Sequence, residues 1–535
     1  MESPFASILH TNIAPSDDEC TRIRYFLTGP RREVANLTQE IVRLQHQLAE
    51  LSRKRDQLEE SIDAHLALVS PARRLPEDVL GTIFIECLPS TGSARLSLLE
   101  PPLLLARICH TWRCIAFSTP RLWSSIHVSV HPASKATSLA AGVSCWLSRS
   151  GILPLSISLI YHKDPHVKGV DGSLSPILES LSAFSVRWKN IHMVLPTFDS
   201  FKPLSHLTSE DLPMLHTVSV SRLLPDHIPS SSPWEFLSFL AASGLRDVCL
   251  PCGYKLSALR LPWTNLTDLK IITEFEHPSF AEPQITYHDV LGILRKCSRL
   301  QTCQLKIDFA DGVGGIAEPV ILPLLWHLDI SLRRSCSVEK LFSSLVLPSL
   351  RSLTCSAPNL DGPPPSCIFH PSLEYLNVRI AALTSAELTD RLQCAPLLRE
   401  LTLCGEPVLS GHGRMDPHHQ RDPDFLTELA LDGSTPFLCP HLCTLALLEM
   451  QALSDMALLA FVRERTDLAR RGVAHLTHVT AQFRRGMESD ILLQLLSLGG
   501  ASIASVLCFY REQIRPGTDS VNGPWAGLSQ LRVTG

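Results

Sequence analysis

One short apolar unit recurs along the chain from about residue 188 onward. Its core is Leu-x-x-[Leu/Val]-x-[Leu/Val/Ile], and the last two apolar positions are two residues apart, so both point to the same face of a strand. Between Leu300 and Leu398 the copies follow one another at steps of 25, 25, 23 and 25 residues. This spacing is typical of leucine-rich repeats, in which each unit adds one strand to a curved solenoid. The copies begin at Leu215, Leu245, Leu266, Leu300, Leu325, Leu350, Leu373, Leu398 and Leu442.

The segments between these strands carry helix start signals. Ser232, Thr286 and Thr384 each precede an apolar run, with an acidic residue three positions later. This is the pattern of a capping box. Alternating strands and helices predict an α/β fold with parallel strands on one face and helices on the other. Longer steps, such as that from Leu398 to Leu442, predict an irregular solenoid. The concave face should carry Ser219, Lys270, Asp329, Thr354, Asn377 and Thr402.

Near the N-terminus the pattern changes to a heptad with apolar a and d positions. Arg55 interrupts it at one a position. The seam predicts a long helix that either pairs with a second copy as a coiled coil, giving a homodimer through residues 34–62, or packs onto the residues that follow. Both interpretations remain open at this stage. The seam residues are Val34, Leu37, Ile41, Leu44, Leu48, Leu51, Leu58 and Ile62.

Two further apolar patterns lie between residues 68 and 126. In the first, Leu75, Val79, Ile83 and their neighbours step by three and four, as on one face of a helix. Pro76 suits a first helical turn, because its missing N–H would have no partner there. In the second, the apolar residues from Leu104 to Ala116 also fall at helical spacing, and Ser118-Thr119-Pro120 ends the helix.

These two patterns resemble an F-box, the helical module that docks a protein onto Skp1 in SCF-type ubiquitin ligases. The resemblance rests on LPEDVLGTIFIECL, then ICHTWRCIA, then STPRLW. It implies a Skp1-like adaptor as partner, a cullin scaffold reached through that adaptor, and a protein target held by the repeats. By the same resemblance, the Skp1-binding residues are Leu75, Pro76, Val79, Leu80, Ile83, Phe84, Leu88, Ile108, Cys109 and Trp112.

The order of segments is similar to that of a family of fungal F-box-like proteins, which also carries the heptad helix, the SPARRLP entry and the phrase WLSRSGILPLSISL. We therefore predict a flexible tail at 1–30, a heptad helix at 31–69, a small all-α F-box-like domain at 70–130 and an irregular leucine-rich-repeat-like domain at 131–535. The alternating residues 153–159 predict a strand, and residues 140–149 a helix.

Composition narrows the range of functions. The 535 residues carry a net charge of −5, so no basic field favours nucleic acid. The 17 cysteines are scattered through leucine-rich segments, as expected of reduced thiols packed as small hydrophobes. The sequence shows no secretory signal and no long uncharged apolar run, so we expect no membrane association and an intracellular protein, cytoplasmic or nuclear.

No catalytic motif is present. The sequence lacks a phosphate-binding Gly-rich loop, a nucleophile elbow and a His-Glu-x-x-His motif. The pair Cys249 and Cys252 and the cluster of His412, His418 and His419 could ligate a metal, but each is more typical of a strand end or a solvated insertion. We therefore expect a non-enzymatic protein without metal or cofactor.

Two hypotheses remain. In the first, the chain is the substrate-recognition subunit of an SCF-type E3 ubiquitin ligase in the ubiquitin conjugation pathway. In the second, it is a leucine-rich-repeat interaction protein that acts outside a ubiquitin ligase, and its F-box-like segment only caps the repeats.

Overall fold

The structure is a computed structural model that describes residues 3–90, 92–131, 134–162, 174–222, 233–251, 259–272, 286–307, 318–332, 338–356, 368–380, 383–405, 426, 438–451, 453–469, 473–499 and 505–510. The chain divides into two units, Met1–Ile83 and Phe84–Gly535. Each unit is described by itself below.

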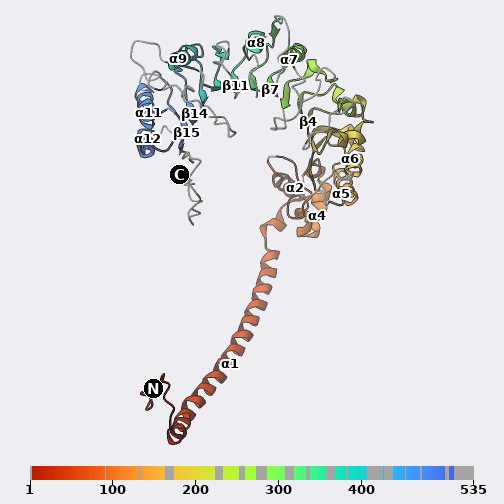
Figure 1. The fold of residues 1–535 in the computed structure, drawn as a ribbon. Coiled ribbons are helices and arrows are strands. Elements are labelled where there is room, and N and C mark those ends of the chain that lie inside the picture. The colour runs from red at the N-terminus through yellow and green to blue at the C-terminus, as the bar shows by residue number, and fades with distance from the viewer. Residues whose placement is uncertain are drawn as a thin grey trace. The chain divides into compact units, whose positions relative to one another are not determined.

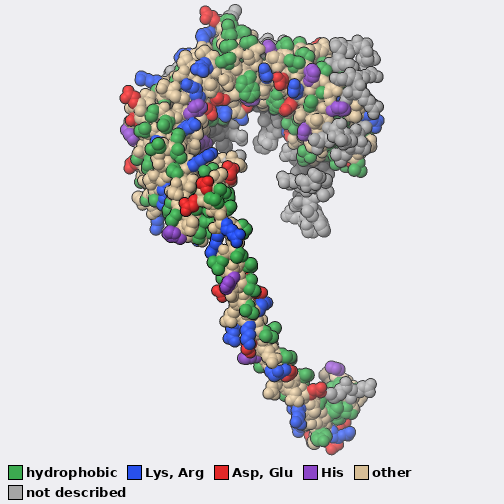
Figure 2. All heavy atoms as spheres, turned by 180° about the vertical axis from the view of Figure 1, so that it is seen from behind, with side chains coloured by type: hydrophobic (Ala, Val, Ile, Leu, Met, Phe, Trp, Pro, Cys, Tyr) green, Lys and Arg blue, Asp and Glu red, His purple; other side chains and the backbone are tan. Residues whose placement is uncertain are grey.

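The first unit is dominated by one long helix, α1 (Asp17–Leu68). The helix begins earlier than predicted, because Ser16 and Glu19 form a reciprocal capping box and three acidic residues occupy the first turn. The prediction of a flexible tail at 1–30 is therefore wrong for residues 17–30. No residue of α1 is buried, and the eight seam side chains are 50–67% exposed. Figure 2 shows hydrophobic side chains along the helix, interspersed with charged ones.

A short 3₁₀ turn, η1 (Pro71–Arg74), leads into α2 (Glu77–Glu86), and the border between the two units falls within α2. In the second unit the predicted second helix is two helices, α3 (Leu105–Ile108) and α4 (His110–Ser118). The break falls at Cys109, whose backbone is extended at φ −154° and ψ 173°. Helix α4 ends at Ser118, as predicted, and η2 (Pro120–Trp123) follows.

Fourteen strands of the second unit form one parallel sheet in the order β1-β2-β3-β4-β5-β6-β7-β9-β11-β12-β13-β14-β15-β16. All nine predicted repeat cores supply strands of this sheet, and so does the strand predicted at 153–159. Their bounds are β1 (Ser125–Val130), β2 (Leu155–Tyr161), β3 (Trp188–Leu195), β4 (Thr217–Arg222), β5 (Asp247–Pro251), β6 (Asp268–Ile272), β7 (Thr302–Ile307), β9 (His327–Leu332), β11 (Ser352–Ser356), β12 (Tyr375–Arg379), β13 (Glu400–Cys404), β14 (Thr444–Met450), β15 (His478–Phe483) and β16 (Ser505–Tyr510). A separate two-stranded ladder joins β8 (Val320–Ile321) and β10 (Leu345–Val346).

The sheet of this unit is curved, with the helices on its outer, convex side and the strands facing the inner, concave side (Figure 1). Two predicted capping boxes are confirmed, at Thr286 before α7 and Thr384 before α9. Ser232 lies outside the described residues, and the segment after it is a kinked 3₁₀ helix rather than an α-helix. Besides α3, α4 and η2, the helices among the described residues of this unit are α5 (Ala136–Ser148), α6 (Ser175–Ser182), η3 (Ser185–Arg187), η4 (Phe198–Leu204), η5 (Ser209–Asp211), η6 (Pro233–Ala241), η8 (Trp263–Asn265), α7 (Tyr287–Leu294), α8 (Val338–Ser343), α9 (Ser385–Gln393), α11 (Asp455–Ala469) and α12 (Leu492–Gly499).

The sheet extends beyond the predicted repeats at both ends. Strand β1 belongs to the sheet rather than to the predicted domain at 70–130, because it pairs in register with β2. At the other end, two strands continue the sheet beyond the last predicted repeat core, since β14 pairs with β15 and β15 with β16. The described residues thus form an α/β fold with a long parallel sheet, which confirms the predicted α/β class.

Burial explains why the repeated unit works. Within each strand the last two apolar residues of the core are buried, as Val218 and Val220 are in β4 and Leu376 and Val378 in β12. The first leucine of the core, such as Leu215, is also buried, just before the strand. One strand cannot cover its own apolar face, so each repeat depends on its neighbours for burial.

Candidate functional site

The first candidate surface consists of the ten residues named from the F-box resemblance. The part in α2 divides into buried and exposed positions. Leu80 and Phe84 are buried, whereas Val79 and Ile83, one helical turn apart, are 39% and 41% exposed. Leu75 and Pro76 precede the helix and are exposed too. The Pro76 carbonyl accepts from the Leu80 N–H at 3.0 Å, so Pro76 stands at the start of the first turn.

The remaining predicted residues lie in or beside α3 and α4, apart from Leu88, which follows α2 and is half-buried. Ile108, the last residue of α3, is 55% exposed. Cys109 is exposed as well, and its Sγ accepts from the Trp112 N–H at 3.4 Å, which caps α4. Trp112 is half-buried against Phe84, with ring centroids 4.9 Å apart. The predicted set thus contains an apolar exposed part and a part that holds the helices in place.

An aromatic cluster fastens α4 to the sheet within the second unit. Trp123 is fully buried and donates its indole N–H to the Ala116 carbonyl at 2.8 Å. Its ring meets Trp146 of α5 edge-on, with centroids 4.9 Å apart. The Arg149 guanidinium lies over the rings of Phe117 and Trp123, at 4.3 and 4.8 Å from their centroids. Trp146 also donates its indole N–H to the Ser125 carbonyl of β1 at 3.3 Å, so the cluster connects α4 and α5 with the first strand.

The loop after α2 is also joined to the sheet. The His127 N–H donates to the Ala94 carbonyl, and Arg95 forms an isolated parallel bridge with His127. Two exposed leucines of this loop, Leu98 and Leu99, were not among the predicted site residues. In the sequence these leucines are an adjacent apolar pair outside both helical patterns, and this could have marked them as candidates.

The second candidate surface is the open face of the sheet, which we define as the strand positions that point away from the helices. Two ladders of side chains run unbroken across this face from β1 to β16, and a third, interrupted row beside the second ladder includes Lys306 and Arg379. All six residues predicted for the concave face lie in the second ladder. The first ladder is Ser125, Ser156, Asn190, Thr217, Asp247, Asp268, Thr302, His327, Ser352, Tyr375, Glu400, Thr444, His478 and Ser505. The second ladder is His127, Ser158, His192, Ser219, Cys249, Lys270, Gln304, Asp329, Thr354, Asn377, Thr402, Ala446, Thr480 and Leu507.

The open face carries charges of both signs. The two unbroken ladders hold four carboxylates and one lysine, and Lys306 and Arg379 of the third row add two more positive charges, so the open face carries nearly equal numbers of acidic and basic groups. Burial and the neighbouring Asp268 raise the pKa of Asp247, although Lys270 opposes this. At the β1 end, His127 Nδ1 and Ser158 Oγ form a hydrogen bond of 2.9 Å. Burial lowers the pKa of both His127 and His192. The histidines there are therefore neutral at pH 7.

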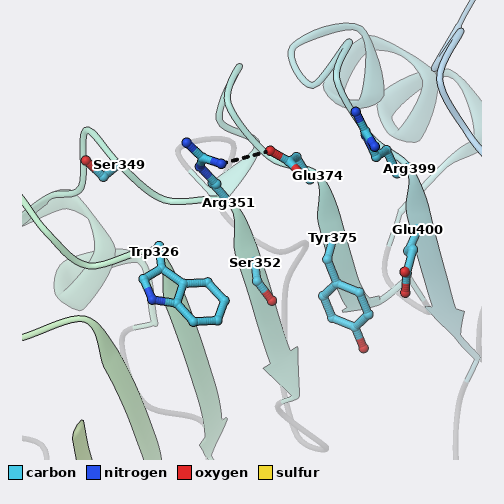
Figure 3. A pocket seen from close by; sticks show the side chains of 8 residues that line it. All are labelled: Trp326, Ser349, Arg351, Ser352, Glu374, Tyr375, Arg399 and Glu400. Carbon is cyan, nitrogen blue, oxygen red and sulfur yellow. Dashed lines mark ion pairs between the residues drawn. The ribbon is translucent and has the colours of Figure 1, made fainter. Parts of the chain in front are cut away.

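A pocket of about 640 Å³ opens on this face at the starts of β9 to β13 (Figure 3). Trp326, immediately before β9, is 45% exposed, although tryptophan is usually buried. Sequence reasoning did not select this pocket. The available signal was an aromatic residue at a variable position of two repeat cores, LWHLDI and LEYLNV. The pocket is lined by Trp326, Ser349, Arg351, Ser352, Glu374, Tyr375, Arg399 and Glu400.

Two buried cysteines are poorly suited to act as nucleophiles. Burial raises the pKa of the Cys297 thiol to about 12 and that of Cys439 to about 11, which disfavours a nucleophilic thiolate. No group of three or more His, Cys, Asp or Glu side chains among the described residues could hold a metal ion. The predicted candidates Cys252, His412, His418 and His419 lie outside the described residues. Within the part of the chain that is described, no helix has both the length and the apolar character to span a bilayer.

No protein-family model matches the sequence, and a comparison with curated proteins finds no relative.

Proposed function

We propose that this protein is the substrate-recognition subunit of an SCF-type E3 ubiquitin ligase. The F-box-like helices bind a Skp1-like adaptor, which connects the chain to a cullin scaffold, and the sheet unit binds a target protein. No residue of this chain performs the chemistry. The subunit instead raises the effective concentration of the target near a ubiquitin-loaded enzyme on the same scaffold.

The observation that carries the proposal is the exposure of apolar motif residues that intrachain packing does not require. Val79 and Ile83 lie on one side of α2 and leave about two-fifths of their surface in water, and Ile108 leaves over half. The buried members of the same motif, such as Phe84, are sufficient to anchor the helices. Exposed apolar residues at positions that match a docking motif support a protein partner.

The aromatic cluster around Trp123 supports the second half of the proposal. Because Trp123 and Trp146 connect α4 with α5 and the first strands, a partner held by α4 stands in a constant position relative to the sheet of the same unit. A receptor that acts by holding a target near an enzyme needs such a connection between its two binding surfaces.

Co-purification with a Skp1 protein tests the proposal. The wild-type chain should give a stoichiometric complex, and the double substitution Leu75→Ala with Pro76→Ala should weaken it roughly tenfold, as expected for an interface anchor. The matched control is Pro323→Ala with Leu324→Ala, an exposed Pro-Leu pair in the sheet unit. It should bind Skp1 as the wild type does. Circular dichroism melting checks that both variants fold.

Equal binding by the wild type and the Leu75/Pro76 variant would contradict the docking role. Absence of any Skp1 complex would leave the alternative function, an interaction protein that acts outside a ubiquitin ligase.

We further propose that α1 pairs with α1 of a second copy through residues 34–62. Its seam side chains are all at least half exposed, so a single chain leaves in water an apolar stripe that only Arg55 interrupts. A two-stranded coiled coil would bury such a stripe. Arg55 within the seam weakens the pairing, which makes it dependent on concentration.

A further inference from the structure

The pocket at the starts of β9 to β13 has a division of charge that identifies its ligand. Arg351 pairs with Glu374 at 3.5 Å, and in Figure 3 these two side chains point toward each other, at the end of the pocket opposite the Tyr375 ring. Arg399 points to that same end. Trp326, Tyr375 and Glu400 extend the other way, onto the open face. The arginines therefore stand at the rim, whereas the aromatic rings and a carboxylate line the face.

Glu400 is the charged group that a ligand would meet there. It is exposed, and no ion pair involves it among the residues that the structure describes. The basic residues of the open face are Lys270 on β6, Lys306 on β7 and Arg379, which lies at the opposite end of β12 from Tyr375. An exposed carboxylate at the pocket end of these strands attracts a cation.

The two aromatic residues are spaced to hold that cation. Trp326 and Tyr375 stand on either side of Ser352, because β11 lies between β9 and β12. With neighbouring strands about 4.8 Å apart, the two backbone positions are about 10 Å apart. An aromatic face attracts a guanidinium or ammonium group that comes within about 6 Å of the ring centroid. Between the two rings lie small or polar groups, Ser352 and the imidazole of His327, which are hydrogen-bonded to each other at 2.8 Å.

We propose that this pocket binds an arginine or lysine side chain of the target protein, with its alkyl stem between Trp326 and Tyr375 and its charge toward Glu400. The inference rests on the proposed function, because it gives the chemistry of the target that the sheet unit recognises.

Fluorescence anisotropy with labelled peptides tests the inference on the full-length protein. The probes are four 12-residue peptides, (Gly-Ser-Arg)₄, (Gly-Ser-Lys)₄, (Gly-Ser-Phe)₄ and (Gly-Ser-Glu)₄, at physiological ionic strength. The arginine and lysine peptides should bind, and the glutamate peptide should not. The variant Trp326→Ala with Tyr375→Ala should bind the arginine peptide about tenfold more weakly. Glu400→Lys should lose the basic peptides and gain the glutamate peptide.

Two matched controls separate the pocket from general attraction to an acidic protein. Phe509→Ala removes an exposed aromatic ring on β16, and Glu318→Gln removes an exposed carboxylate outside the pocket; both should bind as the wild type does. Binding of the phenylalanine peptide alone, or basic-peptide binding that survives loss of both pocket rings, would overturn the inference. Skp1 binding by the same pocket variants is measured in parallel. Its retention alongside lost peptide binding shows that the pocket acts independently of docking, and its absence in the wild type refutes the ligase function without affecting the peptide result.

Discussion

Replacement of Trp123 should show how firmly helix α4, part of the proposed docking surface, is joined to the sheet. Trp123 is fully buried, and truncation of a buried tryptophan to alanine costs about 3–5 kcal/mol. Trp123→Phe keeps most of the apolar ring but leaves the Ala116 carbonyl without its N–H partner, which costs about 1–3 kcal/mol. The stacking of Arg149 on the ring adds a smaller loss of about 0.5–1 kcal/mol in the alanine variant.

Hydrogen exchange is the appropriate assay, because a long repeat sheet need not unfold as one cooperative unit. In Trp123→Ala the opening free energies of amides in α4 and α5 should fall by about the values above, since both helices contact the cluster. The amides of β12, nine strands from β1 in the sheet order, should keep their protection. Trp123→Phe should give a loss of intermediate size in the same helices.

Two results would refute this reasoning. If Trp123→Ala lowered protection equally in α4 and β12, the sheet unit would behave as one cooperative block. If Trp123→Phe and Trp123→Ala gave equal losses, the indole hydrogen bond rather than the packing of the ring would account for the stability of the junction.

Three further predictions concern other parts of the chain. In sedimentation equilibrium, Leu44→Glu with Leu48→Glu should abolish the concentration-dependent dimer that we expect of the wild type, whereas His46→Glu, away from the seam, should preserve it; a wild type that stays monomeric would contradict the pairing. Asp455 is fully buried, and although burial alone raises its pKa, hydrogen bonds from an arginine and two backbone N–H groups lower it overall. Asp455→Ala should therefore lower the stability of α12 and β16 by about 3–5 kcal/mol by hydrogen exchange, with the largest loss near neutral pH, because the contribution of a carboxylate with a lowered pKa disappears as the pH falls through that pKa. Burial lowers the folded-state pKa of His192, so the unfolded chain binds the proton more readily and stability should fall as the pH drops below about 6.5; His192→Gln should make that fall smaller in acid titrations followed by circular dichroism.

Much of the architecture could be predicted because it is encoded locally. The repeat core places its apolar residues two apart, and each such segment became a strand, as Leu376 and Val378 illustrate in β12. The capping boxes at Thr286 and Thr384 depend only on residues three positions apart, and both are present. The break at Cys109 was missed, because helical spacing on both sides of a residue cannot show that the residue itself is extended.

The sequence predicted which residues belong to the proposed docking motif, but not which of them are exposed. The sequence named the apolar residues of α2 but could not separate Leu80 and Phe84, which are buried, from Val79 and Ile83, which are exposed. All four fit the same helical periodicity. Burial depends on which neighbouring segments cover each side of the helix, and those neighbours come from distant parts of the chain.

The sequence by itself therefore determined the alternation of strand and helix, the long charged helix with its apolar seam, and the residues that resemble a docking motif. Only the tertiary structure decided which side chains of different repeats stand next to one another. Trp326 and Tyr375 are 49 positions apart and share a pocket because β11 lies between their strands. Register between strands and the direction of side chains arise from contacts across the whole sheet, so no short stretch of sequence contains them.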